Sequence, residues 1–281
     1  MTARKTDLRL ATSILAYLLA FLALTNGLAE RVHSAVSFFS PVGSLVFGLV
    51  FALVVAALTA LFRWLEGRPV GAGLVPGRGK APAFALGATL GALAYVLVVL
   101  IQWALGYVVF GGMQADSALS MFLASLARNP GLGFGEELAF RGHILSRLCD
   151  RAGFRFAALV SSLLYAGCHY AVWGFGAAAF VGLTLLGLVL AGLVRRTGAL
   201  WASIGFHAAW NITQGGVFGL SMLQAGRGRG LLALEQRGPE ALVGAGFLTE
   251  GGLTTMAVLA ATAVFALWPP RKGPIPLSTS V

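Results

Sequence analysis

The chain has 281 residues, of which 58% are hydrophobic and only 11% are charged, and its mean hydropathy is +0.84. Because soluble domains carry roughly 25% charged residues, this composition excludes an ordinary soluble protein and indicates an integral membrane protein. The formal net charge is +10. The basic residues are scattered at the ends of apolar segments and form no clustered stripe, so they do not indicate nucleic-acid binding.

Eight apolar segments are long enough to be predicted as transmembrane helices, since a span needs about 20 residues. In chain order they are residues 10–28, 43–62, 84–110, 131–148, 156–170, 175–194, 200–220 and 253–268. We therefore predict an all-α, polytopic membrane helix bundle with about eight transmembrane helices, forming one membrane-embedded domain over residues 1–281.

A shorter apolar stretch, residues 117–126, precedes the fourth predicted span. We expect it to form an interfacial helix or the outer end of that span. The helix is predicted to be interrupted at Asn129-Pro130-Gly131, because proline and glycine both disfavour helix continuation.

The Lys and Arg residues indicate how the chain is oriented in the membrane. With eight spans and a cytoplasmic N-terminus, most of them fall on the cytoplasmic side, and the outer side receives only Arg31, Arg128, Arg227, Arg229 and Arg237. This asymmetry follows the positive-inside rule. We therefore predict a multi-pass protein of the plasma membrane with both termini in the cytoplasm, and its composition is typical of a bacterial protein.

Three polar signatures interrupt the apolar segments: Glu136-Glu137-Leu-Ala-Phe-Arg141, Tyr165-Ala-Gly-Cys-His169 and His207-Ala-Ala-Trp-Asn211. Each has polar residues four positions apart, which places them on one helical face. With a rise of about 1.5 Å per residue, the three signatures lie at a similar depth near the middle of the membrane. Ionisable residues at that depth are expensive and usually functional, so the signatures predict one polar site.

The ordered set of signatures resembles the CPBP family of intramembrane proteases. This family includes the type II CAAX prenyl endopeptidases (the Ras-converting enzymes) and bacterial relatives linked to bacteriocin processing and immunity. The resemblance covers about residues 130–215. The sequence departs from the family at Tyr165, where phenylalanine is usual. It also has a long glycine-rich outer loop, residues 224–252, for which the resemblance implies no role.

The resemblance implies a glutamate protease mechanism in which Glu136 and His169 activate water. His207 and Asn211 would then donate hydrogen bonds to the oxyanion of the tetrahedral intermediate. Glu137, Arg141 and Tyr165 are supporting residues, and we expect Glu137 to pair with Arg141, because a second buried carboxylate needs a partner. The implied partners are a peptide or lipidated protein substrate and membrane lipids, with no nucleic acid.

Other interpretations of the same residues stay open. Glu136, Glu137 and Arg141 would also suit an ion-pair cluster that only holds helices together. A zinc-dependent protease would use Glu136, His169 and His207 as ligands, but the chain has no His-Glu-x-x-His motif, so no metal or other cofactor is expected. A third alternative is a non-proteolytic immunity or scaffold protein that binds a peptide or lipidated tail. The sequence indicates neither the substrate nor the oligomeric state.

Overall fold

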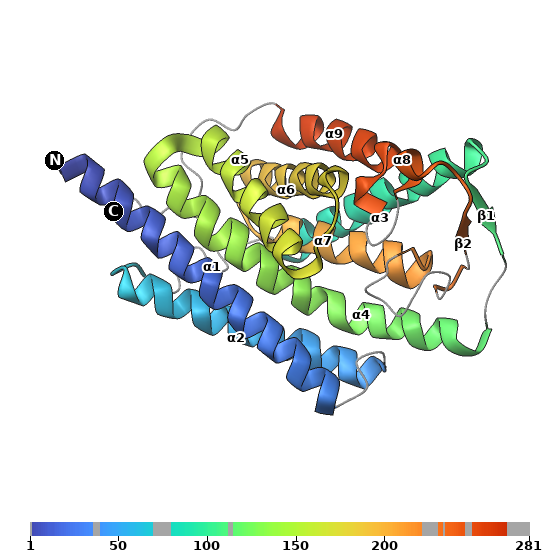
Figure 1. Cartoon of the computed structure of the whole chain (residues 1–281), viewed down its shortest axis with the longest axis horizontal. Coiled ribbons are helices and arrows are strands. Elements are labelled where there is room, and N and C mark those ends of the chain that lie inside the picture. Colours follow the sequence, from blue (N-terminus) through green and yellow to red (C-terminus); the bar gives the residue numbers. More distant parts are fainter. Residues whose placement is uncertain are drawn as a thin grey trace.

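The computed structural model describes residues 2–35, 40–69, 80–111, 115–220, 230–232, 234–244 and 249–268. These residues form a helix bundle, shown in Figure 1. Its α-helices are α1 (Thr2–Ala35), α2 (Pro41–Leu65), α3 (Lys80–Ala104), α4 (Ala115–Glu137), α5 (Ser146–Trp173), α6 (Ala177–Thr197), α7 (Trp201–Asn211), α8 (Glu240–Val243) and α9 (Leu253–Leu267). Two π-helical segments, η1 (Leu138–Leu145) and η2 (Ile212–Val217), extend α4 and α7, and η4 (Thr249–Gly251) is a 3-10 turn. Two strands, β1 (Val108–Phe110) and β2 (Leu234–Gln236), pair antiparallel. The prediction of an all-helical fold is confirmed, apart from this short ribbon.

Five helical stretches are long and apolar enough to cross a membrane: Asp7–Val32, Pro41–Leu65, Lys80–Ala104, Ala118–Trp173 and Ala177–Thr197. The fourth has 56 residues and bends at Gly153, whose φ of 76° and ψ of 168° are not helical. Its two arms run along separate axes in Figure 1. The helix Leu253–Leu267 is apolar but shorter. The chain is therefore a polytopic membrane protein, and the count of eight spans stays a prediction.

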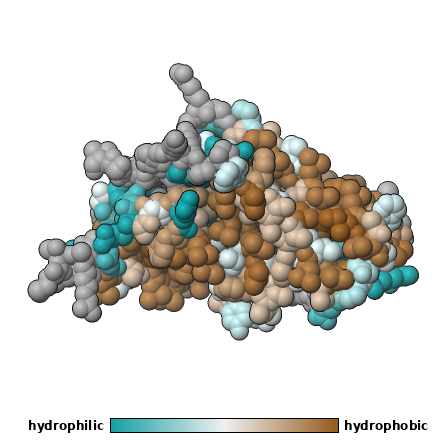
Figure 2. All heavy atoms as spheres, turned by 90° about the horizontal axis from the view of Figure 1, so that it is seen from above, coloured by the Kyte–Doolittle hydropathy of each residue, from teal (hydrophilic) through white to brown (hydrophobic). Residues whose placement is uncertain are grey.

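The outer surface of the bundle is strongly apolar. Figure 2 shows hydrophobic residues covering most of the face seen from above, with hydrophilic residues concentrated toward the ends. Leu53, Trp64 and Leu93 are among many large apolar side chains that are more than half exposed. Such a continuous apolar surface would be unusual on a soluble monomer, but it suits contact with lipid.

The predicted interruption at Asn129-Pro130-Gly131 is wrong, because α4 runs through it without a break. Pro130 lacks an N–H and cannot donate to the carbonyl one turn earlier. The side chain of Asn129 adds bonds in the same turn: its Nδ2 donates to the carbonyl oxygen of Ser125 at 2.8 Å and to Ser125 Oγ at 2.9 Å. Residues 117–126 are therefore part of α4, as expected for the outer end of the fourth span and not for a separate interfacial helix.

The third predicted span, residues 84–110, is too long at its end. Helix α3 stops at Ala104, and Gly106 has a φ of +73°, a value that favours glycine and ends a helix. Val108 and Val109 then lie in β1, opposite Gln236 and Glu235 of β2. Here the β-branched residues form a strand pair, which ties the end of α3 to the loop predicted over residues 224–252.

Glycines allow α4 to lie directly against α2. A Cβ at Gly131 would be 2.2 Å from the carbonyl oxygen of Gly48, and one at Gly135 would be 2.6 Å from the ring of Phe51. Both distances are shorter than van der Waals contact, so no larger residue fits without movement of α2. Small residues at such crossings let membrane helices approach closely.

The same stretch of α4 also contacts α7. The position of a Cβ on Gly133 is 3.3 Å from the backbone of Ile204 and of Ala208. On the other side of α7, Gly91 of α3 packs against the backbone of Phe206. Helix α7 is thus held between α3 and α4, and this brings its His207 next to the glutamates at the end of α4.

Candidate active site

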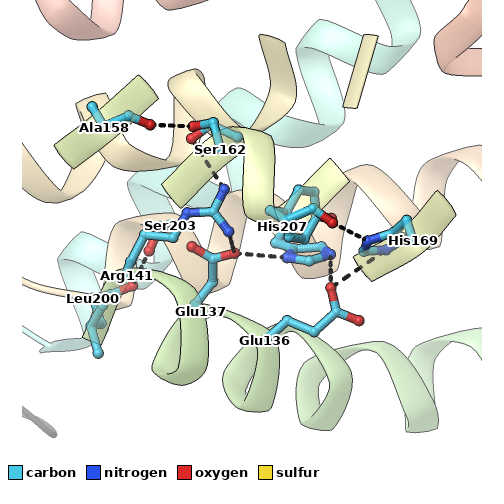
Figure 3. Close-up of polar contacts among 11 residues, drawn as sticks. Glu136, Glu137, Arg141, Ala158, Ser162, His169, Leu200, Ser203 and His207 are labelled. Carbon is cyan, nitrogen blue, oxygen red and sulfur yellow. Dashed lines mark hydrogen bonds and ion pairs between the residues drawn. The ribbon is translucent and has the colours of Figure 1, made fainter. Parts of the chain in front are cut away.

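The three polar signatures meet inside the bundle, as Figure 3 shows. Glu136 and Glu137 are the last two residues of α4, His169 is in α5 and His207 is in α7. The π-helical segment η1 begins directly after Glu137, and η2 begins directly after Asn211. Short π-helical stretches within α-helices are rare and occur often at functional sites.

Two histidines from different helices point at the same carboxylate oxygen. Glu136 Oε2 lies 3.8 Å from His169 Nε2 and 3.7 Å from His207 Nε2. Within the described part of the chain this oxygen has no hydrogen-bond partner. The side chains of Glu136 and His169 are 13% and 20% exposed, so the group is mostly enclosed but can still be reached.

The far nitrogen of each imidazole is held by a hydrogen bond. His169 Nδ1 is 3.0 Å from the carbonyl oxygen of Tyr165, and His207 Nδ1 is 3.0 Å from Glu137 Oε1. A carbonyl and a carboxylate can only accept, so both Nδ1 atoms carry the proton and donate it. Nε2 of each ring is therefore the nitrogen that faces Glu136, as an acceptor when the ring is neutral and as a donor when both nitrogens carry a proton.

The predicted pair of Glu137 and Arg141 is confirmed, with 3.1 Å between Glu137 Oε1 and Arg141 Nη1 and both side chains fully buried. The other terminal nitrogen, Arg141 Nη2, donates to the carbonyl oxygen of Gly187 on α6 at 3.1 Å. The guanidinium carbon also lies 4.6 Å from the centre of the Tyr165 ring. Arg141 therefore links α4, α5 and α6 directly behind the site.

Tyr165 packs between the two parts of the site. Its ring centre is 4.4 Å from that of His169 and 5.3 Å from that of Phe140, and it is nearly perpendicular to Phe140. The side chain is buried. The ring thus separates the Glu137–Arg141 pair from His169, a packing role that suits its position one turn before His169.

Asn211 lies one helical turn after His207 on α7 and is half-buried. Its side chain makes no hydrogen bond with the described part of the chain. The structure therefore brings Glu136, His169 and His207 together, whereas Asn211 adjoins them along the helix without contacting Glu136. Its free amide is available to a bound molecule.

The described residues form no evident zinc site. Among them, no group of three or more His, Cys, Asp or Glu side chains is arranged to hold a metal ion. Zinc needs nitrogen and oxygen ligands at about 2.0–2.2 Å from one centre. The described residues therefore give the zinc alternative no support.

One buried carboxylate near α7 was not predicted as part of any site. Glu250 of η4 is 3% exposed, and its Oε1 accepts hydrogen bonds from Trp210 Nε1 and Gln214 Nε2. The sequence offered one signal, an isolated acidic residue in the apolar and glycine-rich stretch Gly246-Phe-Leu-Thr-Glu-Gly-Gly-Leu253. Helical spacing could not connect it to α7, because it comes from a loop.

The fold and the site together define a polytopic, all-helical membrane protein with a carboxylate–histidine centre enclosed in its bundle. Residues 116–213 match the family model described as Type II CAAX prenyl endopeptidase Rce1-like. The chain therefore contains an Rce1-like domain of the CPBP family, and the resemblance seen in the sequence is confirmed. The matched segment includes Glu136, Glu137, Arg141, His169, His207 and Asn211. No curated protein matches the chain.

Proposed function

We propose that the chain is an intramembrane endopeptidase that hydrolyses peptide bonds of membrane-associated substrates without a metal ion. The observation that carries the proposal is the convergence of His169 Nε2 and His207 Nε2 on the free Oε2 of Glu136. The match of residues 116–213 to the Rce1-like family model supports proteolysis as the reaction. In this proposal the whole chain forms one membrane domain with eight spans and cytoplasmic termini.

Glu136 and His169 activate the attacking water. A water bound against Glu136 Oε2 gives its proton to the carboxylate as its oxygen attacks the peptide carbonyl carbon. His169 Nε2, which has its lone pair toward the same place, orients this water. When the C–N bond breaks, the proton passes from Glu136 to the leaving amine, and the products are a free amine and a carboxylic acid, which then loses the second water proton to solvent.

His207 and Asn211 stabilise the oxyanion. With a proton on each nitrogen, His207 donates through Nδ1 to Glu137 and through Nε2 to the developing oxyanion. The amide of Asn211 provides a second donor one turn further along the same helix. Donors held in place before the reaction are effective, because they need no reorganisation as the charge develops.

The substrate class follows from the family and from the position of the site. A prenylated or otherwise lipidated tail, or a membrane-associated peptide, brings its scissile bond to a centre enclosed by apolar helices. The family description names CAAX prenyl endopeptidases, and we extend this substrate class to the present chain as part of the proposal.

The test is peptide cleavage by the purified protein in liposomes, followed by mass spectrometry of the products. Glu136→Gln keeps the size of the side chain but removes the base, and should lower kcat by at least about 100-fold. Its melting temperature should stay near that of the parent, because Glu136 Oε2 has no hydrogen bond to lose. The matched control is Glu240→Gln, at an exposed residue of α8, which should cleave like the parent.

The same experiment tests the non-proteolytic alternative. A scaffold or immunity protein would give no product from the parent, and would bind the peptide equally well with Glu136→Gln. That combination would refute the proposed protease, as would a Glu136→Gln variant with parental kcat.

A further inference from the structure

The outer loop predicted over residues 224–252, for which the family resemblance implied no role, folds back onto the bundle in its described part. We call residues 230–252 the return segment, of which 230–232, 234–244 and 249–252 are described. It begins near η2, where the N–H of Leu232 donates to the carbonyl oxygen of Val217. It then pairs β2 with β1 and ends at η4, directly before α9. Figure 1 shows it crossing one end of the bundle.

The turn η4 is fixed tightly against α6. A Cβ at Gly182 would be 1.9 Å from the carbonyl oxygen of Glu250. Only glycine leaves room for this approach, so the backbone of η4 is held at one depth along α6. From this position the carboxylate of Glu250 reaches Trp210 of α7 and Gln214 of η2.

Glu250 and Thr249 bond to the end of α7 and to α3. Glu250 Oε1 accepts from Trp210 Nε1 at 2.9 Å and from Gln214 Nε2 at 3.0 Å. Gln214 Nε2 also lies 2.7 Å from Thr249 Oγ1, which is bonded to the hydroxyl of Tyr95 at 2.9 Å. Through this buried network the return segment is hydrogen-bonded to the junction of α7 and η2.

The two residues that bond to Glu250 lie close to two proposed catalytic residues along the sequence. Trp210 and Gln214 are four residues apart and share one face, whereas His207 and Asn211 are also four apart and share the neighbouring face, about 60° away. A rotation of α7 about its axis would therefore move both faces together. The π-helical turn that starts at Ile212 gives this end of α7 a less regular backbone, so its rotation depends more on side-chain bonds.

Burying the carboxylate of Glu250 costs free energy. Its Oε2 is buried without a hydrogen-bond partner in the described part of the chain, and no Lys or Arg there forms a salt bridge with it. A buried carboxylate in this state is not a source of net stability. What Glu250 supplies is an acceptor oxygen that fixes the direction of two N–H donors, Trp210 Nε1 and Gln214 Nε2.

We propose that Glu250 is a positioning residue that sets the rotation of α7, so that His207 and Asn211 face Glu136. The kinetic test of this inference rests on the proposed protease function. The claim about the rotation of α7 does not depend on that function. It assigns a role to the return segment, which becomes part of the active-site scaffold. Glu250 itself touches neither the substrate nor Glu136.

The kinetic test compares Glu250→Ala with Glu250→Gln. Glu250→Ala removes both bonds and should lower kcat about 10-fold or more with KM within twofold of the parent, because small misplacements of catalytic groups are costly. Glu250→Gln keeps an oxygen acceptor and should restore most of kcat. Glu235→Gln, at an exposed residue of the same return segment, is the control and should behave like the parent. A folded Glu250→Ala variant with parental kcat would overturn the proposal.

A second measurement does not depend on proteolysis. The chain has four histidines, so ¹⁵N-histidine NMR can follow the His207 side chain. Its nitrogen signals should shift in Glu250→Ala, stay near the parental positions in Glu250→Gln and not move in Glu235→Gln. Unchanged His207 signals in folded Glu250→Ala would overturn the positioning role, even if no substrate is ever cleaved.

If Glu250→Ala does not fold, Trp210→Phe carries the same test. It removes the indole N–H together with part of the ring system, and keeps a six-membered ring to pack against Phe206 and Tyr95, which contact Trp210 at ring-centre distances of 5.9 and 4.9 Å. The His207 signals should shift, and kcat should fall at unchanged KM. Parental values of both would refute the proposal.

Discussion

Glu137 and Arg141 show how the protein keeps charges inside a membrane bundle. Glu137 Oε1 accepts from Arg141 and from His207, and Arg141 also donates to the carbonyl of Gly187. The pair therefore neutralises itself and fixes the ring of His207. Glu136, the adjacent residue, pairs with no arginine or lysine in the described part of the chain and faces only the two histidines, and this difference separates a structural carboxylate from a reactive one.

We expect Arg141→Ala to affect stability more than the chemical step. The free energy of unfolding should fall. Removing one member of a buried pair leaves the other unpaired, at a cost of about 3–5 kcal/mol. Thermal or denaturant unfolding in micelles measures this. The matched control is Arg237→Ala, which breaks a pair with Glu235 that is more than half exposed and should cost no more than about 1 kcal/mol. A stable Arg141→Ala variant without turnover would instead place Arg141 in the catalytic group.

Much of the site could be predicted from residue spacing. Pairs four residues apart, such as Glu137 with Arg141, are neighbours on any helix, and the apolar segments set their depth. The approach of His169 and His207 to Glu136 also follows from equal depths on neighbouring helices. Glu250 could not be found in this way, because its place depends on a long-range contact with Gly182 that no local pattern encodes.

At the scale of helices, two predictions from local sequence were wrong because tertiary contacts decide the structure there. Pro130 was expected to end a helix, but α4 continues. The side chain of Asn129 bonds to Ser125 in the same turn, and α2 and α7 pack against this stretch. The third span was drawn to residue 110 because hydropathy does not distinguish an apolar helix from an apolar strand. Gly106 was the available signal for its end.

Gly131→Ala should destabilise the bundle by roughly 1–3 kcal/mol, the usual range for overpacking. The added Cβ would lie 2.2 Å from the carbonyl oxygen of Gly48, which is backbone and cannot turn away. The control is Gly167→Ala in α5, where a Cβ meets nothing within 4 Å and the better helix propensity of alanine should be neutral or stabilising. Melting temperatures in one detergent compare the two. Equal values would show that α2 moves freely away from α4.

At the scale of the whole molecule, salt bridges fasten the predicted cytoplasmic ends of the helices. Arg147 of α5 pairs with Glu66 after α2 at 2.9 Å, and Arg151 pairs with Asp7 of α1. These arginines, which the positive-inside rule placed in the cytoplasm, thus also hold α1 and α2 against α5. Their pairing reduces the positive charge that this end presents to a substrate or to lipid headgroups.

The final prediction is that the site opens to the cytoplasm. Hydrolysis near the middle of the membrane requires a path for water and peptide, and the other end is packed: Thr249 and Glu250 of η4 are 1% and 3% exposed, and Phe218 and Leu220 after η2 are 6% and 3% exposed. His169, by contrast, has a side chain that is 20% exposed. The route to Glu136 should pass His169 and begin at the cytoplasmic ends of the helices, where arginines such as Arg155 would attract a tail with a carboxylate.

Cysteine labelling in oriented vesicles measures this access. In a background with Cys149 and Cys168 replaced by serine, His169→Cys should react with a membrane-impermeant maleimide added to the cytoplasmic face, and not with reagent on the outer face. Two exposed positions are the references: Arg155→Cys should label from the cytoplasm and Arg237→Cys from outside. Reversed references would overturn the orientation of the whole chain. Correct references with His169→Cys labelled only from outside would overturn the direction of access alone, because water at Glu136 would then have to enter past the return segment.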